Sequence, residues 1–179
     1  MSTPHQIDLT VIGCSEYLIA GQLLTLFAQA LEDTRGGAAD VAVVHPGEIV
    51  PDYGCGLATV RIVSAEVTTA TQTACLVDEH RVVLELRMVR CYATPENNAM
   101  PAAGVLDSAV RDVVDDARAM RAAITEFRAL TQLRAAAGPW RPVGPKGGIH
   151  GGVMLVNVAT ELGTMTPDVV PMLPDDPRA

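Results

Sequence analysis

The sequence predicts an α+β fold, in which two helices pack on one face of a mostly antiparallel β-sheet. Residues 79–94 carry the clearest strand pattern, because apolar side chains there alternate with a second, charge-bearing set. This alternation is typical of an antiparallel sheet with one covered face. Residues 15–33 and 106–136 have helical periodicity, and several strand-like segments lie between them. This irregular order argues against a doubly wound parallel sheet.

The length of 179 residues fits one domain, which we place at residues 15–160. Residues 1–14 are expected to form an N-terminal arm or edge strand, with residues 7–13 as its β-like part. Residues 161–179 contain four prolines and no regular pattern, so they are expected to form an extended C-terminal arm.

The first helix is expected to begin after Ser15, a residue type that caps helix N-termini well. Its apolar residues recur at helical spacing: Leu23, Leu24, Phe27, Ala30 and Leu31. Strands follow at residues 41–49, 57–67 and 79–94. In the third, one face carries Val82, Leu84, Leu86 and Met88, and the other carries Val83, Glu85, Arg87 and Val89.

The second helix has a narrow apolar seam at heptad spacing, made of Leu106, Val110, Val113, Ala117, Met120, Ile124 and Phe127. Its other face carries Asp112, Asp115 and Asp116 beside Arg111 and Arg118, which reads as ordinary solvated helix charge. A Pro/Gly-rich connection is expected at residues 138–152, and a final strand at residues 153–160.

The net charge of −8 argues that this protein does not bind nucleic acid through basic patches. It also argues against binding to an anionic membrane surface. No apolar run reaches the ~18 residues of a membrane helix, and residues 1–13 do not resemble a signal peptide. We therefore expect a soluble protein made inside a cell, with its four cysteines, Cys14, Cys55, Cys75 and Cys91, reduced.

The stretch GPKGGIHGG at residues 144–152 is the one segment that resembles a phosphate-binding loop. A phosphate loop places its lysine before Ser or Thr at the start of a helix, but here Lys146 precedes two glycines and a strand. The glycines are better explained as a bulge or wide turn that leads into the last strand, close to another backbone.

Histidine and cysteine spacing gives no metal or catalytic motif. His5, His45, His80 and His150 are scattered, and the cysteines form no C-x-x-C pair. An enzyme would have to build its site from His150, Lys146 and Cys55, which would then converge in a concave pocket with shifted pKa values. A binding module would instead use the glycine-rich loop and Trp140. The proline-flanked Trp140 is either a lid over the core or an anchor in an interface.

Three stretches resemble the tail-terminator and neck proteins of long-tailed phages of actinobacterial hosts. These are DYGCGLATVRIV, VVLELRMVRCYATPE with the later DDARAMRAAI, and PVGPKGGIHGGVMLVNV. The predicted order α–β–β–β–α–β is similar to the tail-terminator fold. The resemblance covers residues 15–160 and implies no catalytic residue, cofactor or metal.

The resemblance implies a homo-oligomeric ring, expected to be a hexamer, at the head-proximal end of the tail. It would cap the tail tube, contact the major tail-tube protein and the neck or head-completion protein, and let DNA pass through non-specifically. The protein would then be part of the virion, assembled in the host cytoplasm, with no membrane partner. Another head-to-tail connector, such as a head-closure or adaptor protein, is the alternative. The residues expected at contacts between subunits are Glu85, Arg87, Trp140, Lys146 and His150, and either arm could reach a neighbouring subunit by strand addition.

Overall fold

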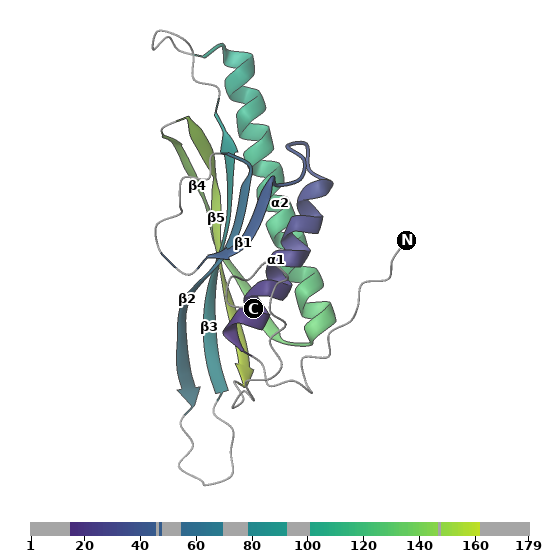
Figure 1. Cartoon of the computed structure of the whole chain (residues 1–179), viewed down its shortest axis with the longest axis vertical. Coiled ribbons are helices and arrows are strands. Elements are labelled where there is room, and N and C mark those ends of the chain that lie inside the picture. The colour runs from purple at the N-terminus through teal and green to yellow at the C-terminus, as the bar shows by residue number, and fades with distance from the viewer. Residues whose placement is uncertain are drawn as a thin grey trace, which may run out of the picture.

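The computed structural model is an α+β fold in which both helices lie on one face of a five-stranded sheet (Figure 1). The structure describes residues 15–45, 47, 55–69, 79–92, 101–146 and 148–161. The elements, in chain order, are α1 (Glu16–Glu32), β1 (Val41–His45), β2 (Leu57–Thr69), β3 (Glu79–Cys91), α2 (Ala103–Thr131), β4 (Arg134–Lys146) and β5 (Ile149–Glu161). The predicted α+β class, with two helices on a sheet, is confirmed, and ring formation stays a prediction. The N-terminal arm and all of the C-terminal arm except Glu161 lie outside the described residues.

The sheet has the order β1-β2-β3-β5-β4. Only β1 and β2 are parallel, and the other three pairings are antiparallel. The two edges differ in composition. The β1 edge reads VAVVH, with neither proline nor an acidic residue, whereas the β4 edge contains Pro139, Pro142 and Pro145.

The core lies between the sheet and the two helices. From α1 it takes Leu23, Phe27 and Leu31, all fully buried, while Leu24 and Ala30 are partly buried against the same cluster. The predicted cap is confirmed, because the backbone N–H of Leu18 donates to Ser15 Oγ at 3.2 Å. The alternation in β3 is confirmed as well, since its four predicted apolar residues are all buried: Val82, Leu84, Leu86 and Met88.

Only part of the apolar seam of α2 is buried against the rest of the fold. Its C-terminal part is buried as predicted: Val113, Ala117, Met120, Ile124 and Phe127. Towards the N-terminus, however, Val110 is 62% exposed, and the neighbouring Val114 is 54% exposed. The end of α2 that carries them extends towards one end of the sheet (Figure 1). The other described segments therefore leave an apolar helix surface uncovered there.

The end of α2 and the whole of β4 differ from the prediction. The helix stops at Thr131, not at residue 136, because Gln132 takes a left-handed conformation and caps it. The residues expected to be helix end and Pro/Gly connection form β4. An edge strand tolerates proline because its outer side needs no N–H donor. The final strand also begins at Ile149, earlier than the predicted residue 153.

The formal charge is divided unevenly between the described segments and the rest of the chain. The described segments hold 13 acidic and 12 basic residues, a net charge of −1. The remaining segments hold 8 acidic residues and 1 basic residue, a net charge of −7. The acidic character inferred from the whole sequence therefore belongs almost entirely to the segments outside the described body.

Candidate functional site

Glu85 and Arg87 lie on the face of the sheet that the helices do not cover, as their alternation in β3 predicted. Glu85 joins two arginines, accepting from Arg61 Nη2 at 3.1 Å and from Arg87 Nη2 at 3.0 Å. The three side chains are only 12–23% exposed. The one carboxylate is shared by two guanidinium groups, so the three side chains are held in place, which suits a fixed contact surface better than a mobile acid–base pair.

The surroundings of this ion-pair cluster are apolar. Glu85 lies opposite Leu155 of β5, and Leu155 is 37% exposed. Thr59 and Val89, on the same face, are 2% and 7% exposed. Leu155 is therefore the exposed apolar side chain beside these fixed charges, a mixture also found in contacts between proteins.

A buried ion pair joins the far end of β3 to α2. Arg90 Nη2 donates to Asp116 Oδ1 at 2.6 Å, and Arg90 Nε donates to Oδ2 at 2.8 Å. The same guanidinium donates to the backbone carbonyls of Gly36 at 2.7 Å and Gly37 at 3.0 Å. Burial raises the pKa of Asp116, and the hydrogen bonds and charge of Arg90 oppose that rise. Arg90 thereby ties β3, α2 and the α1–β1 connection together.

The three aspartates of α2 are therefore not ordinary solvated charge, which corrects the interpretation from the sequence. Asp116 is completely buried. Asp115 accepts the backbone N–H of Arg35 at 2.8 Å. Asp112 Oδ1 lies 3.3 Å from Arg35 Nε, close enough for an ion pair but not aligned as a hydrogen bond. Together the aspartates fix the α1–β1 connection onto α2.

His150 and Lys146, both predicted at contacts between subunits, lie on opposite faces of the sheet. Lys146 pairs with Ile149 and is exposed, whereas His150 is next along β5 and 9% exposed. The His150 ring packs edge-to-face on Tyr92 at 5.4 Å. Burial lowers the pKa of His150, against the opposing effects of the Cys91 backbone and of nearby Asp112 and Asp116.

This lowered pKa predicts a pH-dependent stability. Near pH 6 the unfolded chain binds a proton at His150 while the folded protein keeps this side chain neutral. The contribution of His150 to the free energy of unfolding is therefore complete above its unfolded pKa of about 6.5. It is lost as the pH falls towards the lower pKa of the folded protein. We expect the free energy of unfolding to fall between about pH 7.5 and about pH 5.5, and to fall less in His150→Gln. Urea unfolding of both proteins at each pH measures the difference. Equal slopes would show that His150 does not contribute.

Trp140 lies in β4 on the helix-covered side, partly buried against the core. Its indole covers Gly152, where any side chain would meet the ring. Its Nε1 is buried and has no acceptor within the described segments. This position fits the lid alternative, and a role in an interface stays a prediction.

The glycine-rich stretch forms the tip of the β4–β5 hairpin and the start of β5. Gly144 and Gly148 have positive φ values of 84° and 77°, as turns of this kind require. A side chain at Gly151 would meet the carbonyl oxygen of Met88 on β3. The expected close approach to another backbone is therefore confirmed. The stretch begins a strand, so no helix N-terminus is offered to a phosphate.

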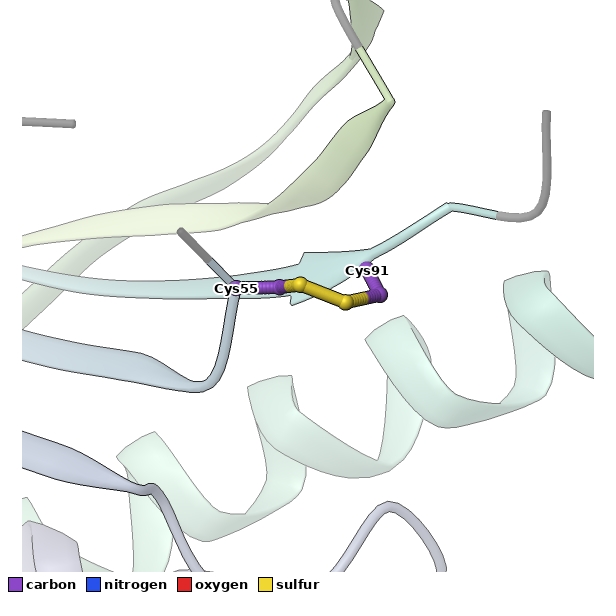
Figure 2. The surroundings of a disulfide bond; sticks show 2 residues. All are labelled: Cys55 and Cys91. Atoms are coloured by element: carbon purple, nitrogen blue, oxygen red, sulfur yellow. A yellow bond between two sulfur atoms is a disulfide. The ribbon is translucent and has the colours of Figure 1, made fainter. Parts of the chain in front are cut away.

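Cys55 and Cys91 are joined by a disulfide, so the expectation of reduced thiols is wrong for this pair. Figure 2 shows the bond between the start of β2 and the end of β3. The pairing of Leu57 with Val89 brings the two Cα atoms to 4.7 Å, although 36 residues separate them in sequence. The other two cysteines lie outside the described residues.

The three residues named for a possible enzyme site, His150, Lys146 and Cys55, do not converge. Cys55 is bonded to Cys91, and His150 and Lys146 point to opposite faces. Within the described ranges, no three His, Cys, Asp or Glu side chains are grouped as metal ligands. No described helix is long and apolar enough to cross a membrane. No family model matches the chain, and no curated protein matches it either.

Proposed function

We propose that this chain is a structural virion protein that forms a ring, expected to have six subunits, at the head-proximal end of the phage tail. As a tail terminator, the ring would cap the tail tube and join it to the neck. The proposal starts from the resemblance of its sequence to tail-terminator and neck proteins. The observation that carries it is the uncovered apolar end of α2, where Val110 and Val114 are 62% and 54% exposed. These two valines lie one helical turn apart, so they can form part of a contact with another protein.

A ring needs two different contact surfaces on each subunit, because its interfaces are heterologous. The chain has two unlike flanks that suit this requirement. One is formed by α1 and β1, where Tyr17 is 48% exposed and Val41 is 41% exposed. The other is formed by α2 and β4, and carries Val110 and Val114. The ion-pair cluster around Glu85 offers a third patterned surface for the tail-tube or neck protein.

The test of assembly compares variants of the exposed valines. We expect Val110→Asp together with Val114→Asp to leave the subunit folded but to weaken ring formation tenfold or more, because a charge would be buried in the interface. Ala129→Asp, at an exposed position on the same helix, is the control and should assemble normally. Mass determination in solution reports the oligomer. A chain that stays monomeric at every concentration would contradict the proposal.

A second experiment distinguishes a tail terminator from another neck protein. Tail-tube protein is polymerised with and without this chain, and the tubes are measured by negative-stain imaging. A terminator should bind one tube end and limit tube length. A ring that forms normally but leaves tube length unchanged would instead fit a head-closure or adaptor protein.

A further inference from the structure

A hollow of about 730 Å³ is lined by residues of the helix-free face of the sheet together with the end of α2 and the start of β4. Its centre is a row across three neighbouring strands: Arg81 on β3 and Arg134 on β4 both pair with Ala159 of β5. Paired residues project from the same face, and two strand spacings place the arginine Cα atoms about 10 Å apart. The small side chain of Ala159 leaves room between them. The hollow therefore resembles a trough with an arginine on each side.

The trough carries a surplus of positive charge within a nearly neutral body. Arg128, in the last turn of α2, also lines it and has no ion-pair partner within the described residues. Arg81 and Arg134 are paired with Glu66 at 2.7 Å and Glu79 at 3.0 Å. These pairs are largely exposed, with Arg134 84% exposed, so they are weak and open to exchange with other carboxylates. Leu133 and Ala136 add apolar lining. An acidic segment with apolar residues would match this surface.

The C-terminal part of this same chain has that composition. Residues 162–179 contain Asp168, Asp175 and Asp176 against a single basic residue, Arg178. Between the first two aspartates lie four apolar residues: Val169, Val170, Met172 and Leu173. Regularly placed prolines favour an extended chain.

The segment also begins beside the trough. Strand β5 ends at Glu161, two residues after Ala159. A segment tethered so close to its binding surface has a high effective concentration there, which favours docking within one chain over docking between chains.

We propose that residues 168–176 fold back into this trough in the same chain. The apolar residues lie along Leu133, Ala136 and Ala159, and the carboxylates of Asp175 and Asp176 pair with Arg128 and Arg134. This contact does not depend on ring assembly.

Hydrogen–deuterium exchange of the full chain, followed by mass spectrometry, tests the proposal. We expect the amides of residues 168–176 to be protected in the wild type. The variant Arg128→Glu should lower that protection about fivefold or more, since it replaces an attraction by a repulsion. Arg111→Glu is the control, because it alters an exposed arginine of α2 outside the trough. Reversing both partners, with Arg128→Glu and Arg134→Glu combined with Asp175→Arg and Asp176→Arg, should restore protection.

Three results would overturn the proposal: an unprotected segment in the wild type, equal protection in Arg128→Glu, or no restoration by the charge swap. Repeating the exchange after tenfold dilution identifies the chain that supplies the segment. Docking within one chain leaves protection unchanged. Protection that disappears on dilution would assign the segment to a neighbouring copy and contradict the proposal as stated. Ring formation is measured separately, so either proposal can fail alone.

Discussion

Asp116→Ala is expected to lower the free energy of unfolding by about 3–5 kcal/mol, because it leaves a buried arginine without its counter-charge. Arg90 is 9% exposed and directs both Nε and Nη2 at Asp116. Its bonds to the carbonyls of Gly36 and Gly37 cannot neutralise the charge. The loss should therefore exceed that of an ordinary hydrogen bond. Urea unfolding followed by circular dichroism measures it.

Two further variants separate charge from packing at this position. Asp116→Asn keeps the shape and part of the hydrogen bonding, so its loss should be smaller than that of Asp116→Ala. Asp107→Ala removes an exposed ion pair on the same helix, with side chains 61–66% exposed, and should cost about 0.5 kcal/mol or less. If Asp116→Ala cost no more than Asp107→Ala, the buried pair would not stabilise the fold as argued.

Gly151→Val is expected to prevent normal folding or to cost more than about 3 kcal/mol, because β5 has no room for a side chain there. Any Cβ at this position would meet the Met88 carbonyl oxygen, a backbone atom that cannot move without breaking the pairing of β3 with β5. Soluble yield and thermal unfolding give the result. Gly151→Ala adds only the Cβ that meets the Met88 carbonyl oxygen, so it should also lower stability, and it gives a second measurement if the valine variant cannot be purified.

Matched controls show whether space is the cause. Gly21 lies in α1 with nothing near an added Cβ, so Gly21→Ala should raise stability by about 0.5–1 kcal/mol. Lys146→Ala, in the same hairpin but exposed, should leave the fold unchanged. A well-folded Gly151→Val protein would contradict the close approach of β5 to β3.

The sequence was most informative where burial follows a simple period. Strand β3 alternates every second residue, so its buried face was predicted correctly. Helix α2 keeps its apolar residues at heptad spacing, and its buried face was predicted correctly from Val113 onward but not at Val110. Strand β4 could not be predicted in this way. Its first residues, RAAA, continue a helical pattern, and three prolines follow. Its conformation depends on pairing with β5 at the edge of the sheet, a tertiary effect that periodicity does not report.

The charged and sulfur-containing contacts were missed for a related reason. Asp116 has the same appearance in sequence as its exposed neighbours, and only the position of Arg90 on a neighbouring strand explains its burial. Cys55 and Cys91 are brought together by strand register, which spacing along the chain does not contain. The position of Glu85 and Arg87 was predictable because it needed only the period of one strand.

The unequal edges of the sheet limit how copies of this chain can associate. Continuous growth of a sheet through many copies requires each copy to offer two edges that can form hydrogen bonds. Strand β1 offers such an edge, but along β4 the row of donors is interrupted at Pro139, Pro142 and Pro145. Two copies could pair through their β1 edges, but the β4 edge of each copy would not pair with a further copy. Fibrous aggregation by strand pairing is thereby disfavoured, even at a high local concentration of the chain.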